Sequence, residues 1–166
     1  MRRPRLSYSA KARVQGHRHV KDTEIELQHI FLEASAQRWQ HLERFFFSYY
    51  CFREGFVGKN GKPDWQIAKK KAPHSQDLFH RHSAVLEPLV PHKVIIGAIK
   101  KMQRDNCLTT SSLGQCLDSL LKYAVISQQE KNQLKRAGLK DCMPATWYTS
   151  KNKVATSRFT EGNIRL

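Results

Sequence analysis

The sequence predicts a mainly α-helical fold made of one long amphipathic helix, a small helix-loop-helix-helix unit, and extended basic tails at both ends. Apolar side chains recur at three- and four-residue steps, which is the period of an amphipathic helix. Two capping boxes mark helix starts, and glycines mark helix ends. The formal charge of +15 lies mainly in the tails and in one loop. We therefore expect three segments: a basic extended tail at 1–21, one α-helical domain at 22–143 with a loop at 55–74, and an extended tail at 144–166.

The composition argues against several classes of protein. Hydrophobic residues make up 40% of the 166 residues, which is enough for a modest core and unlike a wholly disordered chain. No apolar run is long enough to cross a bilayer, so we expect no membrane partner. The four cysteines form no C-x-x-C pair. We therefore predict neither a disulfide scaffold nor a zinc ribbon, and we expect a reducing compartment.

The long helix is predicted over residues 24–54. Thr23 and Glu26 form a T-x-x-E capping box at its start, and Gly55 stands at its end. Residues 44–52, at its C-terminal end, are apolar nearly all the way round, so they need cover on more than one side. Two explanations stay open, because either the rest of the domain or a partner can supply this cover.

The loop at 55–74 combines an aromatic residue with a basic run. Asn60-Gly61 and two prolines indicate turns, and Trp65 stands close to Lys69, Lys70 and Lys71. An exposed aromatic ring beside lysines suits RNA bases or an acidic groove. The alternative is that the tryptophan anchors the loop on the core of its own domain. Beyond the loop, Ser75 is expected to cap a short helix at 76–86, which prolines close off.

The most regular pattern lies at 92–138. One predicted helical face carries Val94, Ala98, Ile99 and Met102, and another carries Leu113, Leu117, Leu120 and Leu121. Ser127 and Glu130 form a second capping box, and Gly138 ends the helix that it opens. The stretch after residue 143 has no apolar period, so we expect it to be extended with isolated aromatic anchors.

Residues 95–121 resemble the helix-loop-helix of an EF-hand in which the calcium ligands are missing. Leu108 takes the central β-bridge position and Asn106 the glycine position. Lys101, Gln103 and Ser112 stand where oxygen ligands belong, so we expect no calcium binding and a packing role. Degenerate EF-hands of this kind, with LTTSSL opening the second helix, are similar to those of ciliary and flagellar axonemal proteins. The resemblance implies a structural protein of motile cilia.

Catalytic signatures are missing from the sequence. His74, His80, His82 and His92 cluster in sequence, but their spacing fits no metal-ligand motif. No nucleophile elbow, phosphate-binding loop or dinucleotide fingerprint occurs. We therefore expect a protein that is not an enzyme, with no catalytic residue, no metal ligand and no cofactor.

The basic tails indicate contact with an acidic assembly. Residues 1–21 contain seven Lys or Arg and no acidic residue. Basic segments of this kind are typical of proteins that bind acidic polymers, although they also serve as solvated tails. The candidate partner-binding residues are those in the tails and in the basic loop: Arg2, Arg3, Arg5, Lys11, Arg13, Trp65, Lys69, Lys70, Lys71, Trp147, Tyr148, Lys151, Lys153, Arg158 and Phe159.

Two functions stay open. The first is a structural protein that binds tubulin and other proteins of the axonemal doublet microtubule, including its lumen, which implies a cytoskeletal location in the cilium or flagellum. The second is an RNA-binding subunit of a ribonucleoprotein such as the mitochondrial ribosome, because lysine and arginine suffice for phosphate contact. The Arg-rich, acid-free residues 1–21 also resemble a mitochondrial presequence, although Pro4 and Gly16 interrupt an amphipathic helix there. The net charge of −3 at 22–54 disfavours RNA.

Overall fold

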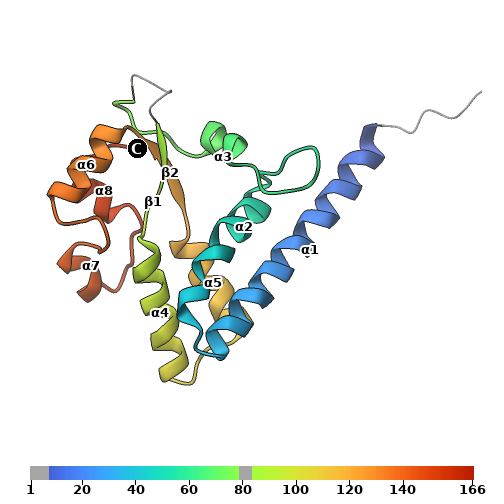
Figure 1. The fold of residues 1–166 in the computed structure, drawn as a ribbon, viewed down its shortest axis with the longest axis horizontal. Coiled ribbons are helices and arrows are strands. Elements are labelled where there is room, and N and C mark those ends of the chain that lie inside the picture. The colour runs from blue at the N-terminus through green and yellow to red at the C-terminus, as the bar shows by residue number, and fades with distance from the viewer. Residues whose placement is uncertain (1–7, 79–83) are drawn as a thin grey trace, which may run out of the picture.

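The computed structural model describes the backbone of residues 8–78 and 84–166, and the side chains of those from residue 21 onward. Within these ranges the fold is mainly α-helical, as predicted, with one small antiparallel sheet (Figure 1). The elements in order are α1 (Tyr8–Ser35), the 3-10 helix η1 (Trp39–His41), α2 (Glu43–Glu54), α3 (Trp65–Lys71), β1 (Val85–Pro88), α4 (His92–Arg104), α5 (Thr110–Leu120), β2 (Tyr123–Ile126), α6 (Gln128–Arg136), α7 (Ala145–Thr149) and α8 (Ser157–Glu161).

The predicted long helix is two helices that pack against each other. The chain leaves α1 at Ser35, passes through Gln37 with a left-handed φ of 56°, and turns into α2 by way of η1. Figure 1 shows α1 and α2 side by side, and Ile30, Leu42 and Phe46 are fully buried in the core to which these helices contribute. The prediction of one continuous helix at 24–54 was therefore wrong. The chain folds back between α1 and α2, which lets α1 cover the aromatic face of α2.

Helix α1 also begins earlier than the sequence predicted. It starts at Tyr8, so residues 8–21 are helical and not an extended tail. Strong helix formers such as Ala, Lys, Arg and Gln fill this stretch, and Pro4 precedes it. Thr23 consequently lies inside α1 and not at its start. The expectation for residues 1–7 falls outside the described residues.

The aromatic end of α2 is largely covered by the chain itself. The ring of Tyr50 lies 4.6 Å from that of Tyr123 and 5.6 Å from that of Phe56, measured between centroids. The ring of Phe46 meets that of His92 edge to face at 5.3 Å. Gly55 ends α2 with a φ of 72°, as its position predicted.

A small sheet begins where the sequence predicted the end of a helix at 76–86, and residues 79–83 of that prediction lie outside the described residues. Strand β1 pairs antiparallel with β2, with Val85 opposite Ile126. On the other side of β2, the backbone N–H groups of Ser75 and Val125 donate to the carbonyls of Val125 and Pro73 at 2.9 and 2.7 Å. Ser75 donates its hydroxyl to Glu130 at 2.8 Å and so does not cap a helix. For the described residues the helix prediction was wrong, since 76–78 and 84 are not helical and 85–86 belong to β1, because β2 supplies backbone partners that a local pattern does not reveal.

The unit at 92–138 contains the three predicted helices, but β2 lies between the last two. Lys101 and Gln103 lie inside α4, so the connection to α5 spans only residues 105–109, shorter than a twelve-residue calcium loop. Asn106 adopts the expected left-handed backbone, with a φ of 53°. Leu108 is not in a β-bridge, because both strands of the sheet lie outside this connection. Ser112 instead donates its hydroxyl to the carbonyl of Cys107 at 2.8 Å and completes a capping box for α5.

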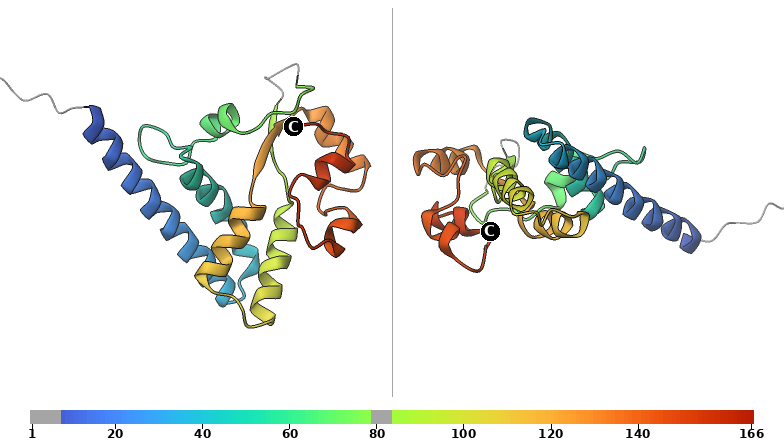
Figure 2. Two further views of the ribbon diagram at one scale, coloured as in Figure 1. Left: turned by 180° about the vertical axis from the view of Figure 1, so that it is seen from behind. Right: turned by 90° about the horizontal axis from the view of Figure 1, so that it is seen from below.

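The C-terminal segment is folded and not an extended tail. It forms α7 and α8, and its Phe159 and Ile164 are buried with Ile126 and Leu134 in a second hydrophobic cluster. Figure 2 shows this segment beside α6, on the side of the molecule opposite α1. The extended-tail prediction for 144–166 was wrong, because two short helices with sparse apolar residues fill a groove that only tertiary packing creates.

Candidate partner-binding surfaces

The structure describes only some of the predicted site residues of the N-terminal segment, and of those only the backbone. Arg2, Arg3 and Arg5 lie outside the described residues. Lys11 and Arg13 belong to the backbone of α1, and their side chains are not described. Their contact with a partner stays a prediction.

Trp65 both anchors its segment and exposes part of its ring. Asp64 caps α3 by accepting from the backbone N–H groups of Gln66 and Ile67 at 2.8 and 3.1 Å, which fixes Trp65 in the first turn. The Trp65 ring packs against Phe47 with centroids 5.0 Å apart, yet 42% of the side chain is exposed. Core anchoring and partner contact, which the sequence left as alternatives, are thus compatible at this residue.

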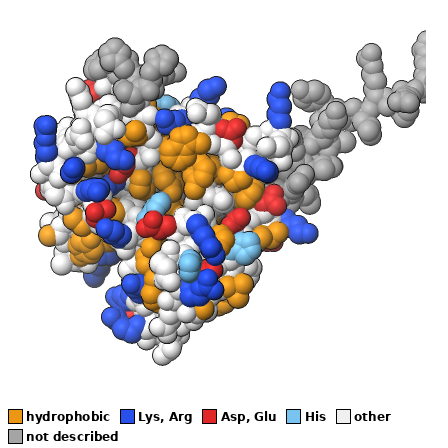
Figure 3. All heavy atoms as spheres, viewed as in Figure 1, with side chains coloured by type: hydrophobic (Ala, Val, Ile, Leu, Met, Phe, Trp, Pro, Cys, Tyr) orange, Lys and Arg blue, Asp and Glu red, His pale blue; other side chains and the backbone are white. Residues whose placement is uncertain are grey.

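The lysines beside Trp65 divide into one structural and two exposed residues. Lys69 is half-buried and donates from Nζ to the carbonyl of Ala84 at 2.6 Å, which ties α3 to the start of β1. Lys70 and Lys71 are exposed in the last turn of α3, where the helix dipole favours cations. Trp65, Lys70 and Lys71 are thus all exposed on α3, hereafter the α3 surface, but the helical spacing places the two lysines roughly 120–140° around the helix from Trp65. Figure 3 shows hydrophobic side chains between α3 and α2.

Trp147 and Tyr148 have different surroundings although they are neighbours. Trp147 is buried and donates its indole N–H to the carbonyl of Val154 at 3.0 Å, so it anchors its own segment. Tyr148 is 50% exposed, and its hydroxyl accepts from the backbone N–H of Met143 at 3.1 Å. Of the two predicted anchors, only Tyr148 offers a large apolar face to solvent.

Lys153 is held in place over α7. Its Nζ donates to the carbonyls of Trp147 and Tyr148, both at 2.7 Å, and lies 4.8 Å from the centroid of the Trp147 ring. Lys151, two residues earlier, is exposed. Two hydrogen bonds and a cation–π contact therefore fix the Lys153 cation beside the exposed Tyr148.

A groove that the sequence did not predict lies between α4 and α7. Its volume is about 590 Å³, and it is hereafter the α4–α7 groove. Figure 3 shows hydrophobic side chains gathered over α7, with Lys and Arg side chains at their margin. The residues that line the groove are Lys93, Val94, Gly97, Ala98, Lys101, Leu120, Asp141, Trp147, Tyr148 and Lys153.

One signal in the sequence could have revealed this groove. Lys93, Gly97 and Lys101 recur at four-residue steps, which places them on one face of α4. Glycine in the middle of a helix costs about 1 kcal/mol relative to alanine. A Cβ at Gly97 would meet nothing within 4 Å, so packing does not require glycine there. Because glycine has no side chain, the space above Gly97 in the groove stays open.

Arg158 and Phe159 cannot contact a partner, because both side chains are fully buried. The Arg158 guanidinium donates to Glu87 Oε1 at 3.0 Å. Burial lowers the pKa of Arg158, and Glu87 opposes that effect. The guanidinium also donates to the backbone carbonyls of Pro88, Leu89, Leu139 and Lys140. Their assignment as partner-binding residues was wrong, because Arg158 satisfies carbonyls of its own chain and Phe159 fills its own core.

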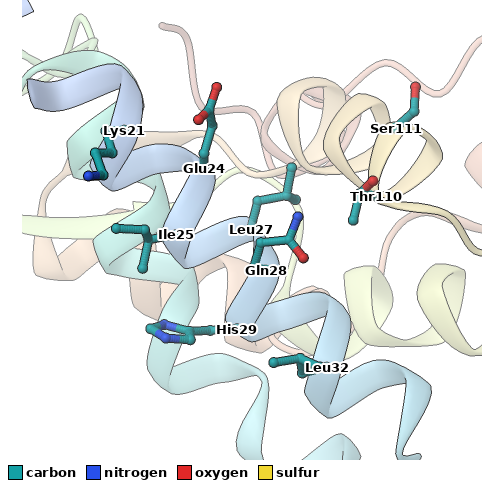
Figure 4. Close-up of a pocket in the computed structure, with 9 residues that line it drawn as sticks. All are labelled: Lys21, Glu24, Ile25, Leu27, Gln28, His29, Leu32, Thr110 and Ser111. Atoms are coloured by element: carbon teal, nitrogen blue, oxygen red, sulfur yellow. The ribbon is translucent and has the colours of Figure 1, made fainter. Parts of the chain in front are cut away.

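A second groove follows α1 (Figure 4). Its volume is about 690 Å³. Figure 4 shows Leu27 on the side of α1 that faces Thr110 of α5, and Ile25 on the opposite side. Ile25 and Leu32 are 43% and 63% exposed. Lys21 and Glu24 carry opposite charges at its margin, so this groove has no preferred sign of charge.

The described residues contain little that could support metal or membrane chemistry. Among them, no group of three or more His, Cys, Asp or Glu side chains is placed to hold a metal ion. In the same part of the chain, no helix is both long and apolar enough to span a bilayer. Burial lowers the pKa of His92. Its Nε2 atom lies 2.8 Å from the hydroxyl oxygen of Tyr123.

Comparison with known proteins found no family model, no curated protein and no solved structure that matches this chain. The inference of function therefore rests on the chemistry of the surfaces described above.

Proposed function

We propose that this protein is a non-catalytic structural protein that binds an acidic protein lattice through its exposed aromatic and lysine side chains. The observation that carries the proposal is the setting of Tyr148, a half-exposed aromatic residue whose backbone carbonyl, together with that of Trp147, holds the exposed cation of Lys153. The α3 surface also exposes an aromatic ring, Trp65, and two lysines, Lys70 and Lys71, although the lysines lie on other sides of the helix than the ring. The formal net charge of +15 adds long-range attraction to any acidic partner.

The two kinds of side chain contribute differently to binding. Lysines attract an acidic surface over roughly a Debye length, about 8 Å at physiological salt, and raise the association rate. Aromatic rings add short-range contact area and slow dissociation. Because Trp147 and Lys153 fix α7 through their own hydrogen bonds, little side-chain order has to be created when the partner binds.

The resemblance of residues 95–121 to degenerate axonemal EF-hands favours tubulin, with its acidic surface, as the lattice. The doublet microtubule of motile cilia, including its lumen, is then the proposed location. Ser112 has a structural role, since its hydroxyl caps α5. The RNA-binding alternative uses the same lysines and the same exposed rings of Trp65 and Tyr148, on which bases can stack, so ribonuclease treatment is needed to separate the two functions.

Co-sedimentation with microtubules tests this proposal. The purified chain should pellet with microtubules, survive ribonuclease treatment of an extract, and be released by high salt. Replacing Tyr148 by Ala and both Lys151 and Lys153 by Gln should weaken pelleting by tenfold or more. The matched control replaces the exposed α6 residues Lys135 and Arg136 by Gln, which removes the same charge.

Two outcomes contradict the proposal. Equal loss of binding in the α7 variant and in the α6 control would show that only net charge matters. Loss of the assembly on ribonuclease treatment, or a tagged protein found in nucleoli or mitochondria and not in axonemes, would favour the ribonucleoprotein alternative.

A further inference from the structure

The α4–α7 groove has an apolar floor and a basic rim. Val94, Gly97 and Ala98 of α4 form the floor together with Leu120 of α5. Tyr148 stands at the wall and is half exposed. The lining residues include three lysines and a single acidic residue, Asp141.

The charges around the groove favour a carboxylate over a cation. Asp141 is already paired with Lys93, with Nζ 3.4 Å from Oδ2. Lys101 is exposed one helical turn beyond Gly97. Lys153 has three N–H donors, of which two go to the carbonyls of Trp147 and Tyr148. The net positive rim therefore complements an acidic ligand.

The floor of the groove selects an apolar side chain. A Cβ at Gly97 would have open space around it, so a side chain from another molecule can occupy that space. Val94, Ala98 and Leu120 supply an aliphatic floor, and of the two aromatic residues in the lining, Trp147 is buried and Tyr148 is half exposed at the wall. An aliphatic or aromatic side chain of a peptide gains more from this surface than a nucleotide does.

We infer that the α4–α7 groove binds a short acidic peptide segment of a partner protein. In the bound segment, an apolar side chain enters between α4 and α7, and flanking carboxylates meet Lys101 and Lys153. This inference rests on the proposed function, which it deepens by assigning one recognition site and the chemistry of its ligand.

Fluorescence anisotropy on the full chain tests the groove. The probe is a fluorescein-labelled synthetic peptide in which glutamates flank a central Leu-Phe pair. Gly97→Leu fills the floor and should weaken binding at least tenfold. Because leucine favours a helix more than glycine does, the same variant should not lower the urea midpoint of unfolding. A lower midpoint would move the test to Gly97→Ala, which should weaken binding several-fold.

Charge reversal separates the rim from the overall charge. Lys101→Glu should weaken binding of the peptide more than fivefold, with a smaller difference at high salt. The matched control is Lys135→Glu, an exposed lysine on α6, which should change binding less than twofold. A second probe with Ser in place of the Leu-Phe pair should bind at least tenfold more weakly to the unmodified chain.

Several results would overturn the inference. They are unchanged peptide binding by Gly97→Leu, equal effects of Lys101→Glu and Lys135→Glu, or equal binding of the Ser-containing probe. Labelled oligo-uridine that binds the parent and is blocked by Gly97→Leu would also overturn it in favour of RNA. If the chain pellets with microtubules but does not bind the peptide, the groove inference is wrong and the proposed function stands. If the peptide binds in the groove but the chain does not pellet with microtubules, the proposed microtubule lattice is wrong and the groove inference stands.

Discussion

Helices α7 and α8 are two five-residue helices in one segment, and each brings an aromatic side chain close to a cation. Around α7, Tyr148 is half exposed and Lys153 lies at the surface. In α8, Arg158 and Phe159 are fully buried. An aromatic residue and a cation thus face solvent around α7 and the core in α8.

The difference lies in the hydrogen bonds that each cation makes. Arg158 directs its planar fork at Glu87 and at four backbone carbonyls, so its charge is compensated inside the fold. Lys153 donates to two carbonyls at the end of α7 and stays exposed. An aromatic residue beside a cation therefore indicates a binding surface only where that cation remains exposed to solvent.

The largest effect is expected from Arg158→Ala. This change leaves buried Glu87 with only Lys131 as an ion-pair partner and leaves several backbone carbonyls without a donor, so the free energy of unfolding should fall by about 3–5 kcal/mol. Urea unfolding followed by circular dichroism measures it. Arg158→Lys should recover only part of the loss, because lysine cannot reproduce the fork. A variant as stable as the parent would show that α8 is not locked by this residue.

Thiol labelling shows whether that loss is local to the second hydrophobic cluster. Cys51 is fully buried in the first cluster, and burial raises the pKa of its thiol to about 12, so it should react slowly at pH 8. Cys142 packs against the second cluster. In Arg158→Ala, a dithiobis-nitrobenzoate reaction at Cys142 should become at least tenfold faster, while Cys51 stays protected.

The background for this labelling experiment is Cys107→Ser, which removes an exposed thiol that would otherwise dominate the signal. Equal acceleration at Cys51 and Cys142 would show that the two clusters open together as one cooperative unit.

A smaller effect is expected from acid, through His92. Burial lowers the pKa of His92, with Glu43 and Glu87 opposing this and Arg158 adding to it. The unfolded chain binds a proton at this residue near pH 6.5, whereas the folded chain keeps it neutral. Stability should therefore fall as the pH drops below about 6.5, and the urea midpoint measured at pH 5 and 7.5 should show this.

Two variants check the assignment to His92. His92→Gln should flatten the dependence of the midpoint on pH in this range. Arg158→Ala removes a nearby cation, so it should also reduce the slope below pH 6.5. A slope unchanged in both variants would assign the acid sensitivity to other groups.

The smallest effect on stability is expected from Lys153→Met. The cation lies at the surface, so its loss should change the free energy of unfolding by no more than about 1 kcal/mol. Affinity for an acidic partner should nevertheless fall several-fold, which co-sedimentation measures. A destabilisation as large as that of Arg158→Ala would remove the distinction between α7 and α8.

Local patterns were sufficient for several parts of this fold. Ser127 and Glu130 form both bonds of the predicted capping box, at 3.1 and 2.7 Å, because the S-x-x-E spacing alone sets that geometry. Gly138 adopts a φ of 73° after α6, and Leu113 and Leu117 are fully buried on one face of α5. Each of these features depends on residues within one or two helical turns.

Other parts depend on segments that are distant in sequence. Val85 joins a strand only because Ile126 lies opposite, 41 positions later. The break between α1 and α2 has no proline, and it is stable because the two helices bury Ile30 and Phe46 together. The α4–α7 groove likewise needs Gly97 and Tyr148 to meet from separate segments.

By itself, the sequence determined that the chain is helical and strongly basic, and that the segment around Asn106 lacks calcium ligands. These properties follow from residue type, periodicity and local backbone preference. Only the tertiary structure decided that Arg158 and Phe159 are internal while Tyr148 and Lys153 remain at the surface. Burial depends on which distant carbonyls, carboxylates and apolar faces surround a side chain, and no local pattern carries that information.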